Sequence, residues 1–325
     1  MVQAFDGVLV VAFGGPQGPA DIRPFLANVL RGRRVSPERI EEVAHHYEPF
    51  GGISPLTERT LRQADGLHRR FADRGLDLPV YVGMRNWHPY LEDTLARMSA
   101  DGVRHAVGFI AAAHRSFSGC LQYRENVAAA RQTLAGRGLA DVDVVYVGDW
   151  HTSAGFIDAN ALHVCEALGR LPEELRAGAR LVFTAHSIPT AMAERYPYEP
   201  QLLESAAAVA AACRRPDYDV VYQSRSGRPE DPWLGPDVRD HLRDCARRGV
   251  RSVVLCPVGF LCDHVEVLYD LDVEAAGVCR EIGLAMVRAA AVNDDPRFID
   301  AMAEAVMRTM DRYGSGRPLP LVARS

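Results

Sequence analysis

Three carboxylates recur at four-residue spacing near the C-terminal end of the chain: Glu266, Asp270 and Glu274. On an α-helix this spacing places them along one face, over roughly 12 Å. Like charges at this spacing repel one another, and no basic residue stands between them. Binding of a divalent cation or relay of protons would justify that cost. The alternative is a solvated acidic helix face without a chemical role.

A histidine, His186, follows the apolar run 181–184, which predicts a buried strand. Neutral imidazole accepts protons near pH 7 and is a good ligand for Fe²⁺ or Zn²⁺. With Glu266 it would form a histidine–carboxylate pair across a cleft. The alternative is a half-buried loop histidine whose hydrogen bonds are satisfied locally.

Further candidates stand in predicted turns. Ser54 precedes the predicted helix 56–74, where it either donates to an anionic group or caps the helix. Trp233 lies in the rigid turn 231–237 and either lines a flat pocket or packs in the core. A basic segment offers guanidinium forks for carboxylates, or is a solvated helix end; its members are Arg23, Arg31, Arg33, Arg34 and Arg39.

Composition excludes several chemistries. All 37 basic residues are arginine, against 42 acidic ones, so the net charge is −5. Without lysine there is no Schiff-base nucleophile, no anchored pyridoxal phosphate and no phosphate-loop lysine, whether or not codon bias is the origin. The turn 14–18 does not match GxGxxG, His264-x-Glu266 lacks the PCxxC of zinc deaminases, and GxSxG and HExxH are absent. The mild acidity argues against a nucleic-acid partner.

The elements that must position these residues alternate between apolar strands and amphipathic helices. Such alternation predicts an α/β fold of two Rossmann-like halves, each a four-stranded parallel sheet flanked by helices, with the active-site cleft between them. The candidates fall at the carboxyl ends of strands, where such folds place their sites. We expect halves at 1–150 and 151–295, and a terminal helix and tail at 296–325 packing back on the first half. The predicted strands are 8–13, 80–83, 106–112, 142–147, 181–184, 219–223, 252–257 and 284–288.

Apolar runs and cysteines indicate the compartment. No run approaches the ~18 residues that span a bilayer, and the N-terminal run 8–13 is too short for a signal peptide. The seven cysteines form no CxxC pair and are expected to be reduced. We therefore expect a cytoplasmic protein without integral membrane contact. We also expect a monomer, because no helix is apolar beyond what two halves would bury.

Taken together, several segments resemble the ferrochelatases, enzymes at or near the end of haem biosynthesis. The likeness runs in order, at family spacing, over nearly the whole chain. It is carried by residues 13–16, 47 with 51–55, 119–123, 185–189, 222–227, 232–237, 257–260 and 263–270. The resemblance implies a chelatase fold with a porphyrin in the cleft, and insertion of Fe²⁺ with release of two pyrrole protons.

The resemblance also implies roles for individual residues. His186 and Glu266 match the family's histidine and glutamate, the expected metal ligands and proton acceptors. Asp270 and Glu274 match its acidic row, a path for metal or protons and a site for a second divalent cation. The positions near the porphyrin are Phe13, Arg31, Tyr47, Ser54, Tyr123 and Trp233.

Departures from the family pattern sharpen these expectations. Phe13 replaces a tyrosine of many soluble members and can only line the pocket. Leu30 replaces an arginine that binds carboxylates in some members, and the adjacent Arg31 is expected to substitute. His46 stands where some relatives have arginine. Some relatives hold a [2Fe–2S] cluster on C-terminal cysteines, but no cysteine follows Cys279, so no cluster and no required cofactor are expected.

The short segments 85–87, 186–190 and 224–227 resemble those of the soluble bacterial branch that acts on coproporphyrin III. Protoporphyrin IX is the second candidate substrate. A chelatase for another metal or tetrapyrrole remains an alternative within enzymes. A non-catalytic porphyrin carrier and a two-lobed solute-binding module are the alternatives outside them.

Overall fold

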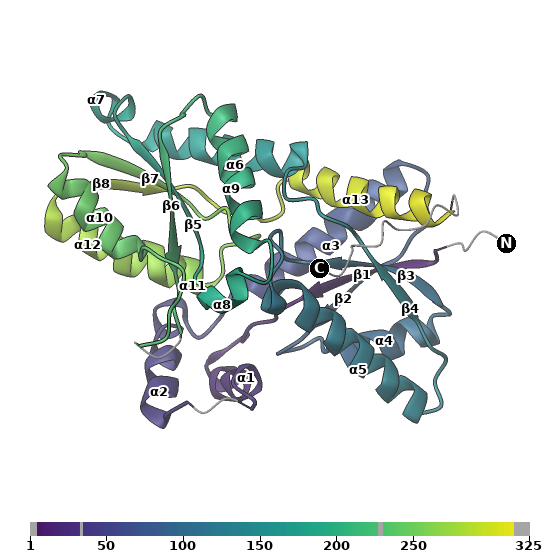
Figure 1. Ribbon diagram of the computed structural model, residues 1–325. Coiled ribbons are helices and arrows are strands. Elements are labelled where there is room, and N and C mark those ends of the chain that lie inside the picture. The colour runs from purple at the N-terminus through teal and green to yellow at the C-terminus, as the bar shows by residue number, and fades with distance from the viewer. Residues whose placement is uncertain (1–4, 33–34, 227–229, 315–325) are drawn as a thin grey trace.

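The computed structural model describes residues 5–32, 35–226 and 230–314, and contains two parallel four-stranded sheets (Figure 1). The first sheet has the order β2-β1-β3-β4 and the second the order β6-β5-β7-β8, so the two halves repeat one topology. This confirms the predicted fold class. The strands are β1 Gly7–Ala12, β2 Val80–Met84, β3 His105–Ile110, β4 Asp143–Tyr146, β5 Arg180–His186, β6 Tyr218–Gln223, β7 Ser252–Cys256 and β8 Ala285–Arg288.

Helices cover both faces of each sheet, which explains why the central strands are apolar throughout rather than alternating. Every residue of β1 is buried. The helices are α1 Ile22–Val29, α2 Pro37–His45, α3 Leu56–Asp73, α4 Leu91–Ala100, α5 Gln122–Gly136, α6 Ala154–Arg170, α7 Glu173–Arg176, α8 Thr190–Ala193, α9 Tyr198–Ala212, α10 Val238–Arg247, α11 Val265–Val267, α12 Ala276–Ile282 and α13 Pro296–Gly314. Two short segments, Phe117–Leu121 and Leu268–Ala275, are π-helical.

The largest hydrophobic cluster runs through both halves. Phe109 of β3 stacks on Trp150, whose ring also contacts Phe156 of α6 and Phe298 of α13. Helix α13 packs against both α3 and α6 (Figure 1). The expected boundary at residue 150 stays a prediction, and the tail 315–325 lies outside the described residues.

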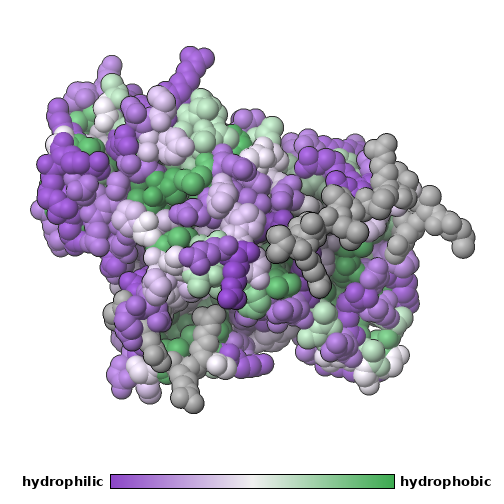
Figure 2. Space-filling model, viewed as in Figure 1, coloured by the Kyte–Doolittle hydropathy of each residue, from purple (hydrophilic) through white to green (hydrophobic). Residues whose placement is uncertain are grey.

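Helices α1 and α2 form a small unit of their own. Their apolar side chains, Phe25 among them, form one cluster with Tyr47, which follows α2, and with Val265 and Tyr269 of the second half. This contact brings the first 50 residues to the segment that carries the acidic row. On the face drawn in Figure 2, hydrophobic residues show near the centre, and hydrophilic residues dominate the periphery. Within the described chain, no helix combines the length and apolarity needed to cross a membrane.

Candidate active site

His186 is the last residue of β5, at the carboxyl edge of the second sheet. The Tyr198 hydroxyl donates to the His186 carbonyl at 2.8 Å, which fixes the backbone. The ring Nδ1 lies 2.5 Å from the Ser187 carbonyl oxygen, and a carbonyl can only accept, so Nδ1 carries the proton. When the ring is neutral, its lone pair therefore lies on Nε2, and this atom is 3.8 Å from Glu266 Oε2.

Glu266 lies in the single turn α11, which His264 caps: the Glu266 backbone N–H donates to His264 Nδ1 at 3.2 Å. The Glu266 side chain is 48% exposed and that of His186 is 34% exposed, so both are within reach of a ligand. A neutral imidazole and a carboxylate this close form a pair that binds a cation or accepts protons. The sequence predicts that these two residues meet across a cleft; the structure brings them together, but both come from the second half.

Asp270 sits one turn beyond Glu266 but in a different environment. Its side chain is nearly buried, at 8% exposure, and accepts hydrogen bonds from Gln223 Nε2 at 3.3 Å and from the Ser224 hydroxyl. Burial raises the pKa of Asp270 to about 7; the Ser224 hydrogen bond opposes that rise, and the charges of Glu266 and Glu274 add to it. Asp270 is thus poised to hold or release a proton near neutral pH.

The acidic row does not lie on one α-helix, so that expectation is wrong. The segment Leu268–Ala275 is π-helical, with i→i+5 hydrogen bonding. Glu266 precedes it, whereas Asp270 and Glu274 lie within it. The three carboxylates are consequently not equivalent, and the solvated-face alternative does not describe the nearly buried Asp270.

Glu274 already has a cationic partner. Arg239 Nη1 lies 3.2 Å from Glu274 Oε2, and Arg239 Nε lies 3.1 Å from Asp237 Oδ1. A cavity of about 150 Å³ adjoins this group and is lined by both halves, with His46 of the first half and Asp270 of the second among its walls. A second cation in this cavity would meet the Arg239 guanidinium.

Aromatic rings from the first half form a wall in the cluster that also holds Val265. The Phe25 ring makes edge contacts with Phe13 at 6.2 Å, with Tyr47 at 6.2 Å and with Trp87 at 6.4 Å. Phe13 is only partly buried and has no donor atom, so lining a pocket is all that its side chain can do. Phe25 and Trp87 are the members of this wall that the site predicted from sequence lacked.

Both predicted tyrosines lie within electrostatic range of Glu266. Burial raises the pKa of Tyr47, and the charge of Glu266 raises it further. Burial likewise raises the pKa of Tyr123; Arg85 opposes that rise, while Glu266 adds to it. The Arg85 guanidinium lies 6.0 Å from the Tyr123 ring centre. The structure therefore gathers Tyr47, which follows α2, and Tyr123 of α5 around a carboxylate more than 140 positions away in sequence.

The remaining predicted residues lie in different surroundings. Trp233 pairs with Pro189 across the loop that follows His186, and it is only partly buried, which favours pocket lining over core packing. Ser54 is buried, but α3 has no side-chain cap, so the capping alternative is wrong. Arg31 is exposed, and its Nη2 donates to Asn28 Oδ1 at 2.8 Å. Arg33 and Arg34 lie outside the described residues.

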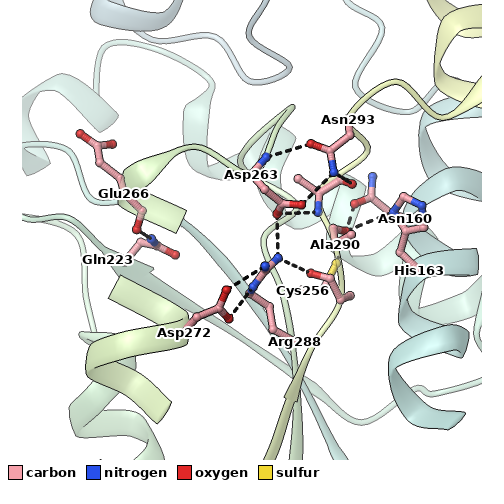
Figure 3. A network of polar contacts seen from close by, with 12 residues as sticks. Asn160, His163, Gln223, Cys256, Asp263, Glu266, Asp272, Arg288, Ala290 and Asn293 are labelled. Atoms are coloured by element: carbon pink, nitrogen blue, oxygen red, sulfur yellow. Dashed lines mark hydrogen bonds and ion pairs between the residues drawn. The ribbon is translucent and has the colours of Figure 1, made fainter. Parts of the chain in front are cut away.

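A guanidinium clamp braces the segment that carries Glu266 (Figure 3). Arg288 at the end of β8 donates to both oxygens of Asp272, at 2.8 and 2.9 Å, and to Asp263 Oδ1 at 2.7 Å. It thereby ties together residues on either side of Glu266. Asn293 also donates to Asp263, at 2.8 Å. Sequence reasoning missed this clamp because a salt bridge between a strand end and a distant loop leaves no local pattern.

Figure 3 also shows Gln223 beside Glu266. The amide of Gln223 meets the Glu266 backbone carbonyl, and the Glu266 carboxylate points away from that contact. Gln223 was not among the residues predicted for the site, although its place at the carboxyl end of a predicted strand indicates a position near the site.

A second cluster of metal-ligating types lies among the described residues, on β6 and α10. Asp219, His241 and Cys245 bring one ligand atom each within 4.8 Å of one another. Arg180 already donates to both Asp219 oxygens, at 2.6 and 2.8 Å. That bidentate pair occupies the carboxylate, so His186 and Glu266 remain the better placed metal ligands.

Comparison with known proteins bears on the family of this chain. The sequence profile of the ferrochelatase family matches residues 5–310. The chain is 46% identical over 313 residues to a ferrochelatase of Rhodopirellula baltica, covering 95% of this chain and 87% of that one. It is 45% identical over 318 residues to a coproporphyrin III ferrochelatase of Streptomyces griseus, covering 93% and 85%.

A solved structure shares the fold. The sirohydrochlorin chelatase of Bacillus subtilis, in complex with cobalt, superposes with a TM-score of 0.58 at 11% identity, covering 97% of this chain and 98% of that one. At that identity the likeness concerns the fold alone. The match to the family profile over nearly the whole chain decides the classification: this chain belongs to the ferrochelatase family.

Proposed function

We propose that this chain inserts ferrous iron into coproporphyrin III, with His186 and Glu266 as its metal ligands and proton acceptors. The observation that carries the proposal is the 3.8 Å approach of His186 Nε2 to Glu266 Oε2 at the carboxyl edge of the second sheet. The names of relatives at about 45% identity supply the choice of porphyrin. Fe²⁺ is the substrate, and the reaction needs no resident cofactor.

The chemistry follows from the acidity of the porphyrin. Pyrrole N–H groups are very weak acids, so two protons must leave as four nitrogens bind the metal. The Nε2 lone pair of His186 and the Glu266 carboxylate offer two acceptors side by side. The partly exposed rings of Phe13 and Trp87 offer flat apolar surface to a macrocycle, and the buried Phe25 packs against both. The charge of Glu266 acts on the buried Tyr47 and Tyr123.

Asp270 extends the proton path from Glu266 into the protein. With a pKa of about 7 it exchanges protons near neutral pH. A second divalent cation at Asp270 and Glu274 is proposed as a weak site only, because Arg239 already neutralises Glu274 at 3.2 Å. Arg31 and Ser54 are proposed to meet the propionates, since a guanidinium fork suits carboxylates. We further propose that the enzyme is cytoplasmic and works as a monomer.

An anaerobic assay tests this proposal. Fe²⁺ is mixed with the chain and either coproporphyrin III or protoporphyrin IX, and the absorbance change on metallation is followed. We expect faster insertion into coproporphyrin III. Faster insertion into protoporphyrin IX would make that porphyrin the proposed substrate. A preference for another metal would overturn the choice of Fe²⁺, and binding without metallation would indicate a carrier instead of an enzyme.

A further inference from the structure

Gln223, the last residue of β6, bonds the backbone beside both proposed acceptors, and the residue is only 1% exposed. We infer that Gln223 is a positioning residue, which sets the place of Glu266 relative to His186. The inference rests on the proposed function, since it names how that site is held. It is carried by hydrogen bonds of both the backbone and the side chain of Gln223.

The backbone of Gln223 holds the His186 side of the site. His186 and Gln223 are register partners across β5 and β6. The Ser187 N–H, which follows His186, donates to the Gln223 carbonyl at 2.8 Å. The chain therefore leaves β5 along a path that Gln223 fixes, and Ser187 in turn supplies the carbonyl that sets the His186 tautomer.

The side chain of Gln223 holds the Glu266 side. Its Nε2 donates to the Glu266 backbone carbonyl at 3.1 Å (Figure 3). The same Nε2 donates to Asp270 Oδ2 at 3.3 Å. One amide therefore fixes the start of the π-helical segment at two points. Because the Glu266 carboxylate itself is half exposed, the placement of its backbone limits where that carboxylate lies.

A purely structural role fits the contacts of Gln223 less well. Its Oε1 is buried without a hydrogen-bond partner in the described chain, which costs free energy. Flipping the amide would turn Oε1 toward the Glu266 carbonyl and the Asp270 carboxylate, both acceptors, so the donor orientation is fixed. The Gln223 amide thus donates twice toward the site through Nε2, while its Oε1 lacks a partner among the described residues. This arrangement favours a role in positioning over a role in stability alone.

The test replaces Gln223 with methionine, which has similar length and no donor. The matched control is Gln63, equally buried at 1%, whose Nε2 donates to the Leu261 and Asn293 carbonyls at 3.1 and 2.7 Å. We expect Q223M to lower kcat for iron insertion about 10-fold or more and to raise KM for Fe²⁺. KM for the porphyrin should stay within about twofold. Q63M should lower Tm and leave all three kinetic constants within about twofold.

Two further measurements keep the inference falsifiable. Q223E preserves the shape but turns the donor into an acceptor, so we expect the same kinetic split as in Q223M. In an E266D background, where the carboxylate is already displaced, Q223M should cost less than about threefold. An unchanged rate in Q223M, or an equal loss in both backgrounds, would overturn the inference. A wild-type chain that inserts no iron would instead overturn the proposed function.

Discussion

At the scale of single residues, neighbouring carboxylates in this site behave differently. Glu266 is half exposed beside His186, Asp270 is nearly buried, and Glu274 is paired with Arg239. The sequence predicted all three as candidates from their spacing. It did not predict their differences, because burial and pairing depend on Gln223 and Arg239, which come from other elements.

The raised pKa of Asp270 predicts how stability depends on pH. The folded-state pKa of about 7 exceeds the ordinary value of 3.8, so the folded protein binds more protons than the unfolded chain between these values. Stability is therefore lost as pH rises from about 4 to about 7. In metal-free buffer, D270N should have a higher free energy of unfolding than wild type at pH 8, by roughly 2–4 kcal/mol. The two should nearly coincide at pH 4. Urea unfolding checks this, and parallel pH curves would contradict it.

The Arg239–Glu274 pair predicts how the outer carboxylates respond to cations. Removing the guanidinium in R239A frees Glu274, so we expect Mn²⁺ to bind at least about 10-fold more tightly, equivalent to about 1.4 kcal/mol. Titration followed by electron paramagnetic resonance measures the free ion. R247A is the matched control, since exposed Arg247 pairs with Asp244 at 3.3 Å, away from the cavity lining. Equal affinities in wild type and R239A would show that the guanidinium does not compete.

At the scale of elements, strands were easier to predict than the π-helical segment. The strands could be predicted because two-sided burial makes the central ones, such as β1 and β7, continuous apolar runs. The edge strands β4, β6 and β8 are only partly buried, but each still has a short apolar run. Helix α6 carries a weak amphipathic signal in the sequence, because apolar residues make up most of it. The i→i+5 bonding of Leu268–Ala275 could not be predicted, since spacing alone does not separate it from an α-helix.

The Arg288 clamp joins Asp263 and Asp272, which lie on either side of Glu266. Loss of the clamp should therefore lower the free energy of unfolding. Arg288 is 13% exposed and contacts two carboxylates, so R288L leaves Asp263 and Asp272 without their common partner. We expect a loss of about 3–5 kcal/mol in the free energy of unfolding. R288K should lose less, because it keeps the charge but not the fork.

Urea unfolding again provides the measurement. R247L serves as the exposed comparison and should change stability by less than about 1 kcal/mol. If R288L also stayed within that range, the clamp would not brace the segment.

At the scale of the whole molecule, the first half adds walls to a site whose His186–Glu266 pair comes from the second half. Tyr47 belongs to the first half and Glu266 to the second, yet the charge of Glu266 raises the pKa of Tyr47. The sequence predicted the two halves and their common topology from alternation alone. The porphyrin contacts of Arg31 and Ser54 remain predictions, because side-chain reach across a cleft does not follow from strand and helix patterns.

The absence of lysine also bears on the whole molecule, because arginine alone supplies its permanent positive charges. Every cationic side chain other than histidine is a guanidinium, and the described ones that matter most here, Arg239 and Arg288, bind carboxylates within the fold. The chemistry proposed for the cleft needs no amine. It needs a neutral imidazole and a carboxylate, which His186 and Glu266 supply.

The most direct test of this pair is the rate of anaerobic Fe²⁺ insertion by H186A and E266Q, measured beside porphyrin binding by fluorescence quenching. Removing a proton acceptor or metal ligand should lower kcat by about 10²- to 10⁴-fold in each variant. Porphyrin affinity should stay within about threefold, since the aromatic wall is untouched. Near-normal insertion rates in both variants would contradict the assignment of His186 and Glu266 as the residues that handle metal and protons.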